Sequence, residues 1–408
     1  MGEVTKRDDA HDVVVIGGGP AGAATATFLQ RQGHRCVVLE RAEFPRYSIG
    51  ESLIPHSYGT LARLGLLEKL QASHFTPKFS VRFVSPGGAE SRPFFFSETI
   101  EGEASQTWQV ERSEFDQMCL EHAAAEGVEI RSDTMVDRVV FDGDRAVGVR
   151  VRTGGVTGEI GARVVVDASG RATKIGNQLE LRQPIPTLRK TSIWSYYKGG
   201  ARGEGLDAGE TTILLLPEKS WAWYIPLPDD IVSVGIVGAP DVVFADTSSP
   251  EDAFANAIAA SDPLSARLAD ASMVAPVRGG SGVLAYRNTQ TVGDGWAMVG
   301  DARAFLDPIY SSGVFLALES AEQAAASIHD GLLAGDVSAA ALGTFENRLN
   351  DGVGVISKLI HAFYDPQFSF EGFLARHPDQ RRALIDCLVG DVFKDMRSFV
   401  SALETMTA

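Results

Sequence analysis

Residues 12–22 read DVVVIGGGPAG, and this stretch decides the fold. The aliphatic run Val13–Ile16 is typical of a parallel strand that is buried on both faces. Gly17, Gly19 and Gly22 then fit a G-x-G-x-x-G pattern. In this pattern the glycines permit a tight turn, close approach of the backbone to a pyrophosphate, and close packing of the next helix. The stretch predicts a dinucleotide-binding βαβ unit.

The residues that follow complete this unit. We expect a helix over residues 20–32 and a second strand over 35–39. Glu40 ends that strand 18 residues after Gly22, where an acidic group holds the adenosine ribose hydroxyls. The residues assigned here to cofactor contact are Gly17, Gly19, Pro20, Ala21, Gly22, Glu40 and Arg41.

Composition limits the partners. The 408 residues include 37 Lys and Arg against 53 Asp and Glu, a formal charge of −16, which argues against a nucleic-acid partner. The three cysteines, Cys36, Cys119 and Cys387, show no metal-ligand spacing, so we expect free thiols in a reducing cytosol and no metal. The N-terminus is polar and no apolar run approaches the ~20 residues that span a bilayer. We expect a cytoplasmic protein.

Two further strands with polar ends lie later in the chain. A buried strand over residues 164–167 is followed by Ala168-Ser169-Gly170, and one over 296–299 is followed by Gly300-Asp301. Asp301 is placed to hold the ribityl chain of FAD, although a helix cap explains it equally well. Arg112 precedes a helix expected over residues 113–126. It could pair with the cofactor phosphates or lie on the surface.

The three motifs, in this order and spacing, resemble those of the group A flavin monooxygenases, whose fold is that of para-hydroxybenzoate hydroxylase. The resemblance implies an α/β protein with a Rossmann-like FAD-binding domain, an inserted antiparallel β-sheet substrate domain and a C-terminal helical segment. The expected parts are residues 1–75, 100–180 and 285–345 for FAD, 76–99 and 181–284 for the substrate sheet, and 346–408 for a helical cap. No second G-x-G-x-x-G indicates an NAD(P)H domain.

Strand-like segments fill the insert, over residues 78–84, 191–197, 211–216, 221–226 and 231–237. Within them, Trp221, Trp223 and Ile225 fall at alternate positions and share one face of a strand. An aromatic core stripe is the ordinary explanation. The full W-x-W-x-I-P pattern, however, resembles the signature of the flavin-dependent halogenases, in which the tryptophans separate the flavin from the substrate.

Lys78 lies between apolar residues in FTPKFS, residues 75–80. Such a lysine is usually a solvated surface residue. It also resembles the lysine of the halogenases, although Ser80 replaces their commoner glycine. A buried amine would have a lowered pKa and could hydrogen-bond or capture hypohalous acid.

Residues 305–313, FLDPIYSSG, resemble the halogenase F-x-x-P-x-x-S-x-G motif and open a long helix expected over 312–333. Backbone N–H groups at a helix N-terminus bind anions. The resemblance assigns Ser312 and Gly313 to halide, Pro308 and Gly313 to the cofactor, and Phe305 and Tyr310 to the substrate. A plain Ser N-cap remains the alternative for Ser312.

Gly50-Glu51-Ser52 also matches the family, either as a loop beside the flavin or as a simple helix-entry turn in which Ser52 or Glu51 caps the segment at Ile54. We assign Ser48, Ile49 and Gly50 to cofactor contact. Tryptophan halogenases carry a glutamate where this chain has Tyr310, which favours the branch that acts on phenols or pyrroles, often tethered to a carrier protein.

The sequence therefore predicts a halogenase that uses FADH2, O2 and chloride or bromide to make hypohalous acid, delivered through Lys78 to an electron-rich ring. Expected partners are a separate flavin reductase and an acyl or peptidyl carrier protein. Two alternatives stay open: an FAD-dependent aromatic hydroxylase that uses NAD(P)H, and a non-catalytic flavoprotein scaffold.

Overall fold

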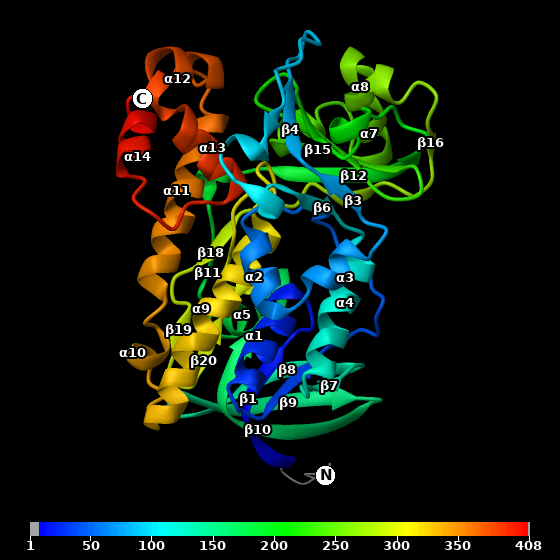
Figure 1. The fold of residues 1–408 in the computed structure, drawn as a ribbon. Coiled ribbons are helices and arrows are strands. Elements are labelled where there is room, and N and C mark those ends of the chain that lie inside the picture. Colours follow the sequence, from blue (N-terminus) through cyan, green and yellow to red (C-terminus); the bar gives the residue numbers. More distant parts are fainter. Residues whose placement is uncertain (1–7, 407–408) are drawn as a thin grey trace.

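A computed structural model describes residues 8–406 (Figure 1). The chain builds two large sheets and a set of C-terminal helices. The first sheet lies at the end that contains the N-terminus, and the second lies at the opposite end. The C-terminal helices lie beside the second sheet. The long helix α11 (Glu346–Tyr364) runs from them along the side of the molecule toward the first sheet.

The first sheet has the order β19-β20-β10-β1-β2-β7, and its central strands are parallel. The residues Val13, Val14 and Val15 are fully buried because helices cover one face and a hairpin the other. The strands are β1 (Asp8–Ile16), β2 (Cys36–Leu39), β7 (Glu129–Arg131), β8 (Thr134–Asp142), β9 (Arg145–Thr153), β10 (Val156–Asp167), β19 (Val292–Gly293) and β20 (Trp296–Met298).

The hairpin of β8 and β9, which pairs with β10, was not predicted. Asp142-Gly143 at its turn is a common hairpin signal. Strands β1, β2, β7 and β20 lie within a few residues of the predicted strands, whereas β10 begins eight residues earlier than predicted and β19 was not predicted.

Helices on the first sheet are α1 (Pro20–Arg31), α4 (Arg112–Ala125) and α9 (Gly313–Ala334), with α1 in contact with both others. The long helix predicted from residue 312 is therefore confirmed, with Ser312 as its N-cap. Smaller helices around them are α2 (Ser57–Leu64), α3 (Leu67–Gln71) and α5 (Lys174–Gln178).

The second sheet has the order β16-β12-β15-β14-β13-β4-β5. It is antiparallel as predicted, except that β4 and β13 run parallel. Its strands are β4 (Ser80–Val84), β5 (Phe94–Phe95), β12 (Thr191–Lys198), β13 (Thr211–Leu215), β14 (Trp221–Pro226), β15 (Ile231–Gly238), β16 (Ser272–Met273) and β17 (Arg278–Gly280), the last paired with β12.

The prediction of a single strand over residues 78–84 was wrong, because Phe79 interrupts it and separates two strands. Lys78 ends the short strand β3 (Thr76–Lys78), which pairs with β6 (Thr107–Gln109) rather than with the large sheet. A third small sheet consists of β11 (Arg182–Pro184), β18 (Tyr286–Asn288) and β21 (Ala304–Phe305).

The two faces of β14 have different neighbours. Trp221, Trp223 and Ile225 share one face, as predicted, and pack with the C-terminal helices. Ala222 and Tyr224 face the opposite side, in a core with α7 and α8. The helices on the second sheet are α6 (Pro240–Val243), α7 (Pro250–Ala259) and α8 (Asp262–Arg267).

The last part of the chain is helical, as expected. Its helices are α10 (Ala339–Leu342), α11 (Glu346–Tyr364), α12 (Phe370–Arg376), α13 (Arg381–Val389) and α14 (Arg397–Glu404).

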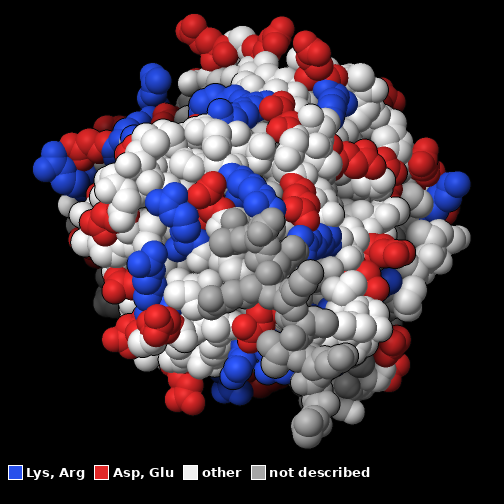
Figure 2. Space-filling model, turned by 90° about the horizontal axis from the view of Figure 1, so that it is seen from below, with Lys and Arg blue, Asp and Glu red and all other residues white. Residues whose placement is uncertain are grey.

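None of the helices within residues 8–406 combines the length and apolar character needed to cross a membrane. Acidic and basic side chains are interspersed on the face that contains the N-terminal end (Figure 2). The division into three domains stays a prediction.

The glycine turn supplies a direct test of this packing. A Cβ added at Gly22 would lie 1.9 Å from the Gly17 carbonyl oxygen. Gly22→Ala should therefore destabilise the protein by at least about 1–3 kcal/mol, the usual cost of overpacking a core. Urea unfolding measures the loss. Gly158→Ala is the control, because a Cβ at Gly158 meets no atom within 4 Å. Equal midpoints for the two variants would contradict the packing described.

Candidate functional site

The glycine turn and Glu40 form the first part of the site. Glu40 is buried at the end of β2, where its Oε2 accepts a hydrogen bond from Gly18 N at 2.8 Å and its Oε1 one from Ala42 N at 3.0 Å. These bonds hold the turn against the start of α1, which begins at Pro20. The turn, with its free helix N-terminus, fits the pyrophosphate of a dinucleotide. Arg41, by contrast, lies exposed beyond the strand.

Arg46 is a site residue that the sequence analysis missed. Its Nη2 atom lies 3.2 Å from where a Cβ would stand on Gly19, so the guanidinium covers the turn. It also approaches Asp116 at 3.2 Å and Glu40 at 3.9 Å. A cation over a glycine turn adds to the attraction for a phosphate. No motif marks this residue, and only the return of the chain over the turn reveals it.

Arg112 is buried, so of the two predicted alternatives the surface position is wrong. It begins α4, pairs with Asp116 at 2.8 Å, and donates from Nη1 to the Ile49 carbonyl at 2.6 Å. A Cβ on Gly50 would approach its Nη1 atom to 2.9 Å. Arg112 thus holds the loop of residues 48–50 in place. Its contact with cofactor phosphates stays a prediction.

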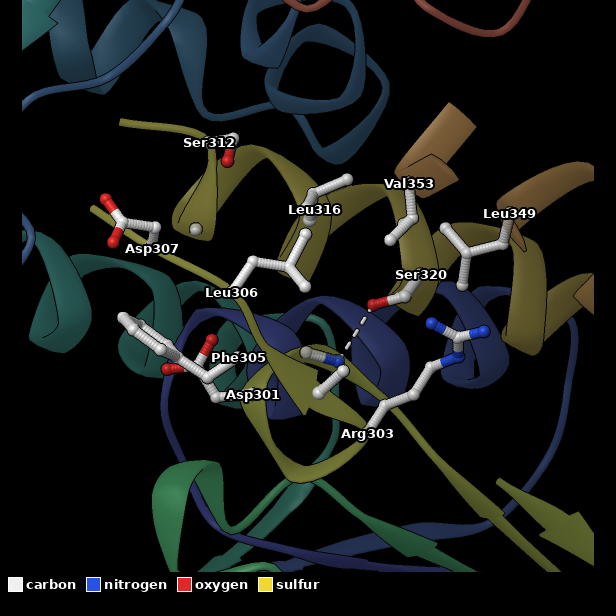
Figure 3. Close-up of a pocket in the computed structure, with 13 residues that line it drawn as sticks. Asp301, Arg303, Phe305, Leu306, Asp307, Ser312, Leu316, Ser320, Leu349 and Val353 are labelled. Carbon is white, nitrogen blue, oxygen red and sulfur yellow. Dashed lines mark hydrogen bonds between the residues drawn. The ribbon is translucent and has the colours of Figure 1, made fainter. Parts of the chain in front are cut away.

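A pocket opens between the start of α9 and the segment after β20 (Figure 3). Ser312 lies at the start of the helix, while Asp301, Phe305 and Asp307 lie on the segment opposite. Ser320 fixes that segment by accepting a hydrogen bond from Gly300 N at 2.9 Å. The pocket therefore contains three of the predicted groups, for the ribityl chain, the halide and the substrate.

Burial and two nearby arginines have opposite effects on the pKa of Asp301. Burial raises its pKa to about 6, and Arg112 and Arg171 act in the opposite direction. Arg171 also lies over the Phe305 ring, with its guanidinium carbon 5.4 Å from the centroid. A carboxylate with hydroxyl-accepting oxygens in such a pocket fits the polyol chain of a flavin nucleotide.

The backbone before α9 takes an unusual course. Ser311 has φ of 54°, in the left-handed region that costs a residue other than glycine about 1–3 kcal/mol. The Ser312 side chain makes no capping bond, and a Cβ on Gly313 would meet nothing within 4 Å. The first N–H groups of α9 have no partners within the helix, and both Ser312 and Gly313 line the pocket. This arrangement favours an anion over a plain Ser N-cap.

A hydrogen-bonded chain joins this loop to the tryptophans. Asp307 accepts from Ile309 N at 3.0 Å and from the Tyr364 hydroxyl at 2.9 Å. The indole N–H of Trp221 donates to the same Tyr364 hydroxyl at 2.9 Å. Burial raises the pKa of Asp307 to about 7, and the sequence analysis gave this residue no role. Pro308 follows it in the bend of the loop.

Trp221 and Trp223 are both buried, with ring centroids 6.1 Å apart. The Trp223 indole donates to the Ser233 hydroxyl at 3.1 Å. Trp194, from the adjoining part of the sheet, lies with its ring 6.4 Å from that of Trp223. The indoles are fixed by hydrogen bonds as well as by packing, so they can form a rigid wall.

Lys78 is fully buried, at 0% exposure. Its Nζ donates to Ser52 Oγ at 2.8 Å and to the Leu53 carbonyl at 3.0 Å, and lies 5.4 Å from the Phe96 ring centroid. No carboxylate within residues 8–406 forms an ion pair with it. Burial alone lowers the pKa of Lys78 to about 7, so a neutral amine is present near physiological pH.

The two residues predicted to contact the substrate lie apart. Phe305 lines the pocket. Tyr310 is buried outside its lining, with its ring 6.3 Å from Phe363 of α11 and its hydroxyl 3.4 Å from the Leu359 carbonyl. Tyr310 therefore anchors the C-terminal helices to the loop that precedes α9.

Comparison with known proteins finds relatives along nearly the whole chain. Residues 10–195 match the family described as FAD binding domain. The chain is 30% identical to a 1H-pyrrole-2-carbonyl–peptidyl-carrier-protein chlorinase of Pseudomonas fluorescens, over 98% of this chain and 95% of that protein. It is 31% identical to the corresponding brominase of Pseudoalteromonas luteoviolacea, over 94% and 93%. The structure of a flavin-dependent brominase superposes with a TM-score of 0.88 at 31% identity, covering 97% of this chain and 98% of that one.

The buried amine predicts a pH-dependent stability. Folding lowers the pKa of Lys78 from 10.5 to about 7, so the unfolded chain binds more protons between these values. The resulting loss of folding stability is complete below pH 7, where it is about 5 kcal/mol, and it disappears as the pH rises toward 10.5. The stability of Lys78→Met relative to the natural protein should therefore be greater at pH 6 than at pH 10.

Chemical unfolding of both proteins at the two pH values measures this difference. Lys69→Met, at an exposed position on α3, controls for the loss of one positive charge. A Lys78→Met difference that does not change with pH would show that the amine remains charged in the folded protein.

Proposed function

Because this chain belongs to the flavin-dependent halogenases, we propose that it halogenates a pyrrole or phenol ring carried on an acyl or peptidyl carrier protein. The enzyme uses FAD and a halide. The observation that carries the assignment of the site is Lys78, an amine without a counter-ion in a dry environment. Neither packing nor an ion pair accounts for such a costly group.

Bound FAD in its reduced form would supply two electrons that reduce O2, and the oxygen reduced to the peroxide level would oxidise the halide. The chain's part is to bind and orient. The Gly17–Gly22 turn, Glu40 and Arg46 would hold the nucleotide end, and Asp301 the polyol chain. Arg112 would keep residues 48–50 against the cofactor.

The halide would bind at the N-terminus of α9, at the amides of Ser312 and Gly313. This proposal is supported by the position of Ser312 and Gly313 in the lining of the pocket, directly after the left-handed Ser311. Chloride and bromide both fit this chemistry, since the donors are backbone N–H groups.

Hypohalous acid formed there would reach Lys78 past Trp221 and Trp223, if these tryptophans separate flavin from substrate as they do in the family. The neutral amine can accept a hydrogen bond from the acid or take the halogen as a chloramine. Either way the halogen is confined and oriented before it meets the ring. The water-poor surroundings protect it from side reactions.

The proposed acceptor rests on two observations. The two relatives with nearly complete coverage are named for a pyrrole on a carrier protein. In this chain Tyr310, a buried phenol, stands where a base for an indole would be needed, and burial holds its pKa well above the usual value. Rings as electron-rich as pyrrole or phenol need little help from a base. We also propose a separate flavin reductase, since the sequence contains one dinucleotide turn.

The assay combines the protein with FAD, a flavin reductase, NADH, O2 and chloride or bromide. Acceptors are a pyrrolyl-carrier conjugate, free pyrrole-2-carboxylate, a soluble phenol and free tryptophan, and mass spectrometry detects the added halogen. We expect the carrier conjugate to react fastest. Preferential halogenation of tryptophan would contradict the proposed acceptor.

Lys78→Ala should reduce halogenation by at least about 100-fold while peroxide release continues, because oxidant formation does not need the amine. Lys69→Ala, on the surface, is the matched control. Full halogenation by Lys78→Ala, with normal peroxide release, would disprove the role of Lys78.

A further inference from the structure

A second titratable group lies next to the Lys78 site. Glu51 is buried, and its Oε1 accepts a short hydrogen bond from the Tyr196 hydroxyl at 2.6 Å. Its Oε2 has no partner within 3.5 Å in the described part of the chain. Burying a carboxyl with half of its acceptors unused is costly, so a functional use is the natural explanation.

From Glu51 a chain of hydroxyls leads outward. The Tyr196 hydroxyl lies 3.0 Å from that of Tyr47, and the Trp194 indole donates to Tyr47 at 2.5 Å. Tyr47 is 44% exposed, and the Arg278 guanidinium lies 4.0 Å above its ring. The tyrosines thus connect a buried carboxyl with solvent in two hydrogen-bond steps.

Glu51, at the inner end of this chain of hydroxyls, lies near groups that hold Trp223 and Lys78. Ser233, which accepts the Trp223 indole N–H, also faces the Glu51 carboxyl. The residue after Glu51 is Ser52, which accepts the Lys78 amine. Glu51 therefore lies beside the Ser233 hydroxyl that holds Trp223, and it is the sequence neighbour of the Ser52 hydroxyl that holds Lys78.

Halogenation itself needs a path for protons. Reduction of dioxygen to two waters takes four electrons. FADH2 supplies two of them, and the other two are released when the halide and a C–H bond are converted to a C–X bond. Two waters form and take up four protons, of which FADH2 releases two and the ring one. One proton must therefore enter for each turnover, and the site excludes bulk water.

We propose that Glu51, Tyr196 and Tyr47 form the relay that carries this proton from solvent to the reaction chamber. Tyr47 takes a proton from water and passes its own to Tyr196, which passes one to Glu51. Glu51 then delivers a proton from the Oε2 side, and the chain resets by rotation of the hydroxyls. No oxidation or reduction occurs in the relay.

The charges around the relay suit this task. Burial raises the pKa of Glu51 to about 7, opposed by the hydrogen bond of Tyr196, the nearby Ser233 hydroxyl and the charge of Arg112, while Glu111 adds to the rise. Burial and Glu51 keep the pKa of Tyr196 far above its usual value, so it stays a neutral donor. The carboxyl is protonated below about pH 7, so the supply of protons should fall as the pH rises above 7.

The test compares Tyr196→Phe, Glu51→Gln and Tyr47→Phe. Tyr197→Phe is the matched control, because Tyr197 is the next residue of β12 and packs on the opposite face against Phe254. The inference rests on halogenation but not on the carrier-borne acceptor, so the kinetics use whichever of the four acceptors above reacts. We expect kcat to fall at least about 10-fold for Tyr196→Phe and Glu51→Gln, with a flattened pH profile. Tyr47→Phe should raise the solvent isotope effect.

Infrared spectroscopy of the protein without flavin provides a second readout that needs no acceptor. The spectrum of the natural protein, after subtraction of the spectrum of Glu51→Gln, should show the C=O band of a protonated carboxylic acid. This band should disappear as the pH rises, with a midpoint near pH 7. Tyr196→Phe should raise that midpoint, because it removes a donor that lowers the pKa. An absent band, or wild-type kcat and pH profile in Tyr196→Phe and Tyr47→Phe, would overturn the relay. Tyr47 is exposed, so its replacement does not threaten folding.

Discussion

The burial of the Lys78 amine without a counter-ion is the constraint on which the rest of the site depends. A buried ammonium is tolerated only if the proton can leave or if acceptors surround it. The segment of residues 50–53 supplies those acceptors, Ser52 Oγ and the Leu53 carbonyl. The interruption between β3 and β4 at Phe79 contributes to this arrangement. Because of it, Lys78 lies outside the large sheet, and its amine contacts this segment.

The same four residues connect the other parts of the site. Gly50 lies against Arg112, which begins α4 under the nucleotide turn. Glu51 bonds to Tyr196 of the second sheet, and Ser52 lies 2.9 Å from the Thr211 hydroxyl of β13. One extended segment therefore ties the cofactor region to the sheet that carries the tryptophans. A shift of this segment would move the amine, the carboxyl and the cofactor loop together.

The sequence predicted most of the fold because its signals were local. The glycine turn, the apolar strands and the tryptophan face of β14 follow from spacing and periodicity alone. Arg46, Glu51 and Asp307 could not be found that way, since their roles come from neighbours far along the chain, such as Asp116, Tyr196 and Tyr364. The break at Phe79 was missed for a similar reason. Its cause is the pairing of β3 with β6, some 30 residues later.

The most direct test of this account is the titration of Lys78 itself. NMR of protein labelled with ¹³C at the lysine ε-carbon, with the signal assigned by its loss in Lys78→Met, gives the pKa of the amine in the folded protein. The account predicts a midpoint near 7. A midpoint near the ordinary 10.5 would show a charged ammonium at neutral pH and would contradict the proposed capture of the halogen by a free amine.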